Sequence, residues 1–225
     1  MMSMRFHDRS EAGRLLASRL DAYAKRPDVV VLGLARGGVP VAYEIAMELG
    51  LPLDVLIVRK LGVPYQPELA MGAIASGGIR ILNQDVIESL GIPSRVIESV
   101  AIDEQREIER REHLYRGARP APRIRGNTVI VVDDGIATGA SMRAAVAAIR
   151  QHVPTACVVA VPVASTEACD AIRSVSDECV CLVEAEYFLG VGAWYDKFPQ
   201  VSDEEIHALL DGARLSGHDH PDVWI

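Results

Sequence analysis

Two adjacent carboxylates follow an apolar segment near the middle of the chain. Residues 129–132, all valine or isoleucine, lead into Asp133 and Asp134, and residues 135–141 form a short loop with two glycines and two hydroxyl side chains. Such a loop, with a helix behind it, offers backbone N–H groups and the positive end of a helix dipole, which together bind a phosphate dianion. The carboxylates repel that phosphate and are expected to face hydroxyl groups. A ribose 5-phosphate satisfies both halves of the segment.

The order of these residues resembles the phosphoribosyl pyrophosphate (PRPP) signature of type I phosphoribosyltransferases. That signature has a hydrophobic run, two acidic residues, a short loop and a Thr-Gly pair. The resemblance implies that Asp133 and Asp134 hydrogen-bond the ribose hydroxyls, and that the loop binds the 5-phosphate through Gly135, Ile136, Ala137, Thr138, Gly139, Ala140 and Ser141. The alternative is an ordinary turn between a strand and a helix.

A second glycine-containing turn, Ala35-Arg36-Gly37-Gly38, follows the first predicted strand. Open α/β sheets bind ligands at the carboxyl ends of their strands, and glycines let the backbone approach an oxyanion closely. The turn resembles the pyrophosphate loop of the family, which often reads Ser-Arg-Gly-Gly in members that act on purines. A tight turn without a ligand is the alternative.

Arg59 and Lys60 follow the next predicted strand directly. Two cations at this position resemble the Arg-Lys pair of the orotate and adenine phosphoribosyltransferases, and the resemblance implies that both contact pyrophosphate. The segment after them corresponds to the mobile loop that closes over the substrates of the family, where closure would exclude water. A pair of solvated surface charges is the alternative.

Transfer of a phosphoribosyl group breaks a C1–O bond with oxocarbenium character. Catalysis therefore depends on positioning and on neutralising the departing charge. The resemblance implies a Mg²⁺ cofactor held mainly by pyrophosphate, ribose oxygens and water, so we assign no direct protein ligand to the metal. It implies catalytic roles for Arg36, Lys60, Asp133 and Asp134.

The acceptor would bind near the aromatic residues Trp194, Tyr195 and Phe198, in the part of the chain that corresponds to the hood of the family. An aromatic ring there can stack on a planar heterocycle; packing of the C-terminal helix is the alternative. Ala137 stands where the 6-oxopurine enzymes usually have Asp, which disfavours hypoxanthine, guanine and xanthine. The sequence therefore leaves the heterocycle unidentified.

Strand and helix patterns alternate along the chain, which is typical of an α/β fold with a mainly parallel sheet flanked by helices. The predicted strands cover residues 28–34, 54–58, 129–132, 156–161 and 179–183. The predicted helices cover residues 10–25, capped by Ser10, a segment between Pro40 and Gly50, and residues 83–90, 103–112, 139–151, 166–175 and a stretch after Ser202. Residues 59–81 are predicted as a long loop that ends in a hairpin at Gly77-Gly78.

We expect one phosphoribosyltransferase-like domain over residues 1–225. Its Rossmann-like core would cover residues 10–183, the hood and C-terminal helix residues 184–215, and a tail residues 216–225. The composition, with 49% hydrophobic residues, fits a domain with a sizeable core.

The net charge of −8 argues against a nucleic-acid partner. No segment approaches the ~20 apolar residues of a membrane span, and the first residues lack the apolar core of a signal peptide. The four cysteines have no zinc spacing and are typical of reduced core thiols. We therefore expect a cytoplasmic protein, which could be a homodimer.

Two functions remain open at this point. The first is an enzyme that transfers the ribose 5-phosphate of PRPP to a nitrogenous heterocycle and releases pyrophosphate. The second is a regulatory protein of the same fold that senses PRPP or nucleotides without catalysis. Arg36, Arg59 and Lys60 favour the enzyme, because a sensor of ribose phosphate could dispense with a pyrophosphate site. A dinucleotide-binding domain is excluded by the missing G-x-G-x-x-G pattern.

Overall fold

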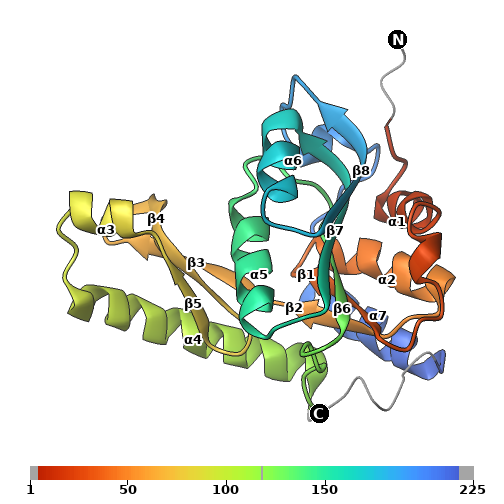
Figure 1. The fold of residues 1–225 in the computed structure, drawn as a ribbon, viewed down its shortest axis with the longest axis horizontal. Coiled ribbons are helices and arrows are strands. Elements are labelled where there is room, and N and C mark those ends of the chain that lie inside the picture. The colour runs from red at the N-terminus through yellow and green to blue at the C-terminus, as the bar shows by residue number, and fades with distance from the viewer. Residues whose placement is uncertain (1–4, 118, 218–225) are drawn as a thin grey trace.

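The centre of the fold is a parallel five-stranded sheet (Figure 1). The computed structural model describes residues 5–117 and 119–217. The strands are β1 (Val29–Leu34), β2 (Leu53–Leu56), β6 (Thr128–Val132), β7 (Ala156–Ser165) and β8 (Glu178–Ala185), in the order β2-β1-β6-β7-β8. Nearly every strand residue from β1, β2, β6 and β7 is buried, as continuous apolar strands predict for a sheet covered on both faces. The predicted fold class is confirmed.

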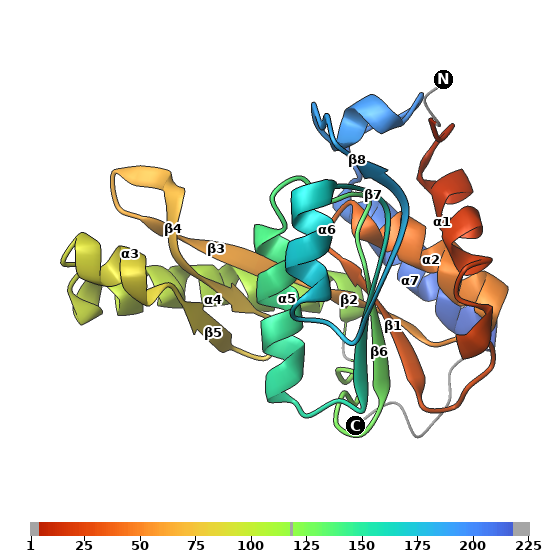
Figure 2. The same ribbon diagram turned by 45° about the horizontal axis from the view of Figure 1, so that its top comes forward.

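Helices cover both faces of this sheet (Figures 1 and 2). Alternate residues of β1 illustrate the division: Val29 and Val31 pack with α1 (Arg9–Ala17), α2 (Gly38–Leu49) and α7 (Asp203–Leu215). Val30 and Leu32 pack on the other face with α5 (Ala140–Gln151) and α6 (Thr166–Arg173). The two cores follow from the two-residue period of side chains along a strand.

Helix α1 differs from its prediction at both ends. Asp8, not Ser10, caps it, because the Asp8 carboxylate accepts the N–H of Glu11 at 2.9 Å. The helix ends at Ala17, well before Lys25, and a short 3₁₀ helix follows at Asp21–Tyr23. Leu16 and Leu20 are buried, whereas Leu15 is 38% exposed.

Residues 58–82 form an arm that projects from the core (Figure 1). The arm is an antiparallel sheet of β3 (Val58–Val63), β4 (Gln66–Ala75) and β5 (Ile79–Leu82), so the predicted long loop is wrong. Its glycines fit close strand pairing: a Cβ on Gly72 would overlap the carbonyl oxygen of Ile81. The hairpin turn at Gly77-Gly78 is confirmed, and both residues have positive φ.

Two helices connect the arm to the sheet. Helix α3 (Gln84–Ser89) begins after the Asn83 cap, and α4 (Ser94–Arg116) then runs back along the arm. The predicted i,i+4 charge pairs are present, among them Glu107 with Arg111. However, α4 is not solvated on all sides, because Ile108 and Tyr115 are buried.

The remaining elements lie close to their predicted positions. Gly50 ends α2 with a left-handed conformation, and Ser202 caps α7 by accepting the N–H of Glu205. Residues 186–201, here called the hood, connect β8 to α7 and contain a 3₁₀ helix at Val191–Trp194. Of the predicted tail, residues 218–225 lie outside the described residues. Within the described parts of the chain, no helix has the length and apolar character needed to cross a membrane.

Candidate active site

The acidic pair and the glycine turn meet at the carboxyl edge of the sheet. β1 and β6 are neighbours, with Gly33 opposite Val132, so the residues that follow each strand emerge together. A Cβ on Gly37 would overlap the carboxylate of Asp134, and a Cβ on Gly38 would lie 2.8 Å from the Cα of Asp133. Only glycine fits at this contact. The structure thus brings together two motifs separated by about a hundred residues in the sequence.

The loop after the acidic pair is fixed by β7. Ile136 forms an isolated bridge with Ala164: its N–H donates to Val163 O at 2.9 Å, and its carbonyl accepts the N–H of Ser165 at 3.0 Å. The Ser165 hydroxyl also donates to Ala137 O at 2.8 Å. These bonds hold the beginning of the loop, while Ala137, Thr138, Ala140 and Ser141 remain exposed. Sequence reasoning missed Ser165, although its position at the end of β7 was a usable signal.

Helix α5 begins at this loop with donors that a ligand can use. Its N-cap is Gly139, which has a φ of 74° and supplies no side-chain acceptor. The N–H groups of the first helical turn have no partner within a helix, and the Thr138 hydroxyl oxygen lies as far as 3.5 Å from Ala140 N. Arg143 adds a cation beside the loop, with its guanidinium donating to Thr138 O at 3.2 Å. The arrangement suits a phosphate dianion.

The two aspartates have different surroundings. Asp133 is half-buried, and its Oδ1 accepts the N–H of Asp134 at 2.9 Å. Burial, together with the neighbouring carboxylate, raises the pKa of Asp133 well above its usual range. Asp134 is buried, and its Oδ2 accepts from Arg9 Nε at 2.9 Å and from Arg9 Nη2 at 2.8 Å. Sequence reasoning missed Arg9, because no local pattern relates a residue of α1 to one that lies 125 positions later.

The predicted pyrophosphate cations lie in different places. Lys60 lines a cavity of about 620 Å³ between the arm and the start of α5, together with Ser141 and Arg143. Arg59 points to the other side of β3, where its Nε lies 2.6 Å from Glu104 Oε2 on α4. Neighbouring strand residues face opposite sides, so the structure brings Lys60 to the loop but not Arg59. Arg36 lies beside the glycine turn, with Nη1 3.9 Å from Asp203 Oδ1.

The predicted aromatic residues of the hood pack mainly against protein. Tyr195 is 2% exposed, lies between Phe6 and Phe198, and donates its hydroxyl to Asp134 O at 2.6 Å. Phe198 stacks on Tyr195 at 5.0 Å and carries the Arg9 guanidinium 3.8 Å above its ring. Trp194 packs on the same cluster. The geometry therefore favours packing for these three residues.

The hood nevertheless covers the loop. A Cβ on Gly135 would lie 2.6 Å from Val191 Cγ1, so the 3₁₀ helix of the hood rests directly on the first loop residue. Two large apolar side chains of the hood, Tyr187 and Leu189, are 89% and 95% exposed. Sequence reasoning missed this pair, and the signal was an apolar run after the last strand, where a solvated turn is expected.

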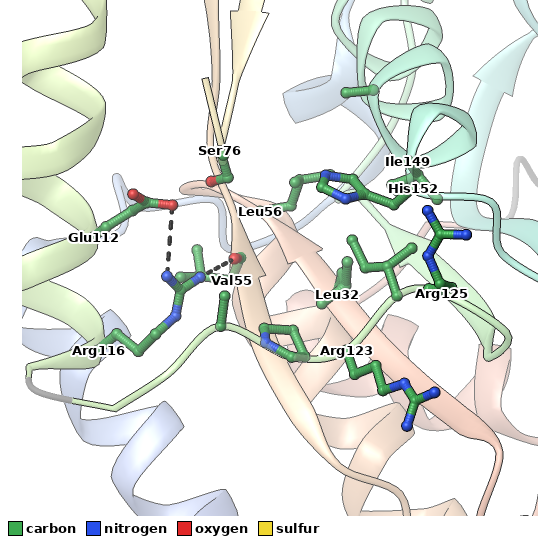
Figure 3. A pocket seen from close by; sticks show the side chains of 15 residues that line it. Leu32, Val55, Leu56, Ser76, Glu112, Arg116, Arg123, Arg125, Ile149 and His152 are labelled. Atoms are coloured by element: carbon green, nitrogen blue, oxygen red, sulfur yellow. Dashed lines mark hydrogen bonds and ion pairs between the residues drawn. The ribbon is translucent and has the colours of Figure 1, made fainter. Parts of the chain in front are cut away.

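A separate cavity of about 560 Å³ lies away from these loops (Figure 3). It is enclosed by α4, the end of α5, the central strands and residues 121–125, and none of the predicted site residues lines it. On one side Arg116 pairs with Glu112 and donates to Val55 O, and on the other His152 and Arg125 approach apolar walls. The acidic pair and the phosphate-type loop do not belong to this cavity.

Within the described residues, no group of three or more His, Cys, Asp or Glu side chains could hold a metal ion. Asp133 and Asp134 stand together at the ribose-facing edge, but Asp134 is already paired with Arg9. This donor set fits a hydrated metal that a bound ligand carries, and not a metal enclosed by protein side chains.

The sheet order and the two apposed loops define a protein of the type I phosphoribosyltransferase fold class. The model of the family described as phosphoribosyl transferase domain matches residues 7–191. The chain belongs to this family, which confirms the resemblance found in the sequence.

Two relatives are similar over most of the chain. A Mycobacterium tuberculosis H37Rv protein with a provisional phosphoribosyl transferase name is 46% identical over 208 residues, which are 92% of this chain and 47% of that protein. The chain therefore spans about half the length of the curated relatives it matches. The crystal structure of TT1426 from Thermus thermophilus is 43% identical, has a TM-score of 0.81 and is covered to 98%, against 92% of this chain.

Proposed function

We propose that the protein is a Mg²⁺-dependent phosphoribosyltransferase that transfers the ribose 5-phosphate of PRPP to a nitrogenous heterocycle and releases pyrophosphate. The observation that carries the proposal is the contact of residues 35–38 with the acidic pair, beside the uncapped start of α5. One edge of the sheet then offers donors for a phosphate, acceptors for ribose hydroxyls and backbone for a second oxyanion.

Each part of the substrate has a place in this arrangement. The 5-phosphate accepts hydrogen bonds from the N–H groups and hydroxyls of residues 137–141. The ribose hydroxyls donate to the acidic pair. The pyrophosphate lies against Gly37 and Gly38, with Arg36 on one side and Lys60 reaching from the arm. When bound, Mg²⁺ supplies positive charge to the pyrophosphate and ribose oxygens.

The reaction breaks the bond between C1 and the pyrophosphate oxygen, and a nitrogen of the acceptor forms the new bond to C1. Negative charge accumulates on the leaving pyrophosphate, so the cations of Lys60 and Arg36 interact more strongly in the transition state than in the bound substrate. The hood lies over the loop and limits the access of water to C1. The exposed Tyr187 and Leu189 are the hood side chains best placed to meet an acceptor ring.

A non-catalytic sensor is the second candidate. It is favoured by the ion pairs of Arg59 with Glu104 and of Arg36 with Asp203, because both cations are already engaged with protein carboxylates. A sensor would bind PRPP or a nucleotide and leave it intact. The expected cytoplasmic location and the homodimer also stay predictions.

Ligand binding and turnover test the proposal separately. Ribose 5-phosphate, and PRPP with Mg²⁺, should raise the melting temperature, because a ligand of the folded state stabilises it by mass action. Release of pyrophosphate from PRPP would then be followed against a panel of nucleobases. No thermal shift with any of these ligands would contradict the site itself, whereas binding without pyrophosphate release would favour the sensor.

Lys60→Ala distinguishes a role in the transition state from simple binding. We expect the turnover rate to fall by about 10²-fold, the order of one lost oxyanion donor, with a smaller loss of PRPP affinity. Lys25→Ala, an exposed lysine elsewhere on the molecule, is the control and should leave both unchanged. Equal losses of rate and affinity in Lys60→Ala would reduce Lys60 to a binding residue.

A further inference from the structure

Arg9 uses every side of its guanidinium in the folded protein. Nε and Nη2 both donate to Oδ2 of Asp134, at 2.9 and 2.8 Å, and Nη1 donates to Pro199 O at 2.8 Å. The flat face of the group lies 3.8 Å from the centre of the Phe198 ring. Arg9 is 8% exposed and Asp134 is 9% exposed. A guanidinium held on two edges and one face has a single orientation, which a lysine could not reproduce.

Asp134 joins parts of the chain that lie far apart in the sequence. Its carboxylate is bound by Arg9 of α1 and touches the glycine turn at Gly37. Its backbone carbonyl accepts the hydroxyl of Tyr195 at 2.6 Å. The hood is tied to the same point twice, through Tyr195 and through the bond from Arg9 to Pro199.

Asp133 has none of these attachments. Its only hydrogen bond within the described residues comes from the N–H of Asp134, and no Lys, Arg or His there pairs with it. It is also less buried than Asp134. A carboxylate at a binding edge that lacks a cation is suited to accept hydrogen bonds from a ligand, because a ligand hydroxyl would give it the donors it lacks.

We propose that the acidic pair is divided in function: Asp133 binds the ribose hydroxyls, whereas Arg9 and Asp134 form one positioning unit that holds the glycine turn and the hood in register with the phosphate loop. This inference rests on the proposed function and assigns Arg9 a role in it. Arg9 acts through Asp134 and does not touch the substrate.

The unit is tested with Arg9→Met, Asp134→Asn and the double variant, compared with Asp133→Asn. Arg14→Met is the matched control, because Arg14 lies on the same helix with an exposed pair to Glu44. Ribose 5-phosphate affinity would be measured by calorimetry, the urea midpoint by circular dichroism, and protection of residues 186–201 by hydrogen exchange.

We expect Asp133→Asn to weaken ribose 5-phosphate binding by about tenfold or more, the loss of one charge-assisted hydrogen bond, with an unchanged urea midpoint. Arg9→Met should lower the urea midpoint and the protection of the hood, because it leaves a buried carboxylate unpaired. The double variant should regain part of that midpoint and lose no more affinity than Arg9→Met alone, since the two residues act as a unit. Arg14→Met should match the wild type in all three measurements.

Other outcomes would overturn the division. Loss of affinity in Asp134→Asn equal to that in Asp133→Asn, with normal midpoint and hood protection, would make Asp134 a ribose ligand. Additive effects of Arg9→Met and Asp134→Asn would mean that the two do not form a unit. If Arg9→Met does not fold, Arg9→Lys keeps the charge but loses the bond to Pro199, and unchanged hood protection in it would equally refute the role of Arg9. Failure of the wild type to bind ribose 5-phosphate would instead contradict the proposed function, while the coupling of Arg9 to the hood would still be measured by exchange.

Discussion

At the scale of single residues, the site depends on contacts that leave no room for a side chain. Gly37 has a φ of −62°, which any residue adopts, so its identity is required by space and not by backbone conformation. The atom nearest to its missing Cβ belongs to the carboxylate of Asp134. A methyl group here would push on the same carboxylate that Arg9 holds.

We therefore expect Gly37→Ala to weaken ribose 5-phosphate binding and to destabilise the fold by about 1–3 kcal/mol, the usual cost of overpacking. Gly212→Ala is the control: the site is helical, its Cβ would lie 3.4 Å from Tyr43 Oη, and alanine should stabilise the helix by about 0.5–1 kcal/mol. Urea denaturation and calorimetry measure both. A Gly37→Ala protein with wild-type affinity and stability would contradict the described contact.

At the scale of elements, the arm and α4 are joined to the sheet through a buried ion pair. Arg116, the last residue of α4, places Nε 2.8 Å from Asp54 Oδ2 on β2, and both side chains are buried. The bond from Arg116 to Val55 O adds a second link to the same strand. The end of α4 is thereby fixed next to the base of the arm that carries Lys60.

Arg116→Met should lower the free energy of unfolding by about 3–5 kcal/mol, because it leaves the Asp54 carboxylate buried and unpaired. Arg106→Met removes an exposed pair with Asp103 from the same helix and should change stability by less than about 0.5 kcal/mol. Equal effects of the two variants in urea denaturation would show that the buried pair has no special importance.

The elements also differ in how far the sequence predicts them. β1 and β6 are short apolar runs followed by glycines or carboxylates, so both the parallel sheet and the position of the phosphate loop could be predicted. The arm could not, because its glycines and prolines resemble a loop and its pairing depends on partners ten or more residues away. Arg9 and the packing role of Tyr195 were equally hidden, since both depend on tertiary contacts with Asp134.

At the scale of the whole molecule, the thiols are kept protonated by the core. Burial raises the pKa of Cys157 from 9.0 to about 11, and it raises the pKa of Cys179 to the same value. Burial also raises the pKa of Cys181. None of the four cysteines is in a disulfide.

These shifts give stability a definite dependence on pH. Between about pH 9 and 11 the unfolded thiols lose protons that the folded ones keep, so their contribution is complete below pH 9 and is lost as the pH rises. We expect the free energy of unfolding to fall over this interval, and to fall less steeply in Cys157→Ala. Iodoacetamide should label Cys157 slowly at about pH 8 in the native protein and rapidly in urea. Fast native labelling, or an identical pH slope in the variant, would contradict this account.

The attachment of the hood to Asp134 also has a consequence for synthesis on the ribosome. A nascent chain that has emerged through Ala185 contains every strand of the central sheet, the acidic pair and the phosphate loop. It still lacks Tyr195, Phe198 and Pro199, so Arg9 and Asp134 would meet without the groups that hold them. The scaffold can thus form before the binding edge is complete, and the capacity to hold ribose phosphate matures only when the hood has left the exit tunnel.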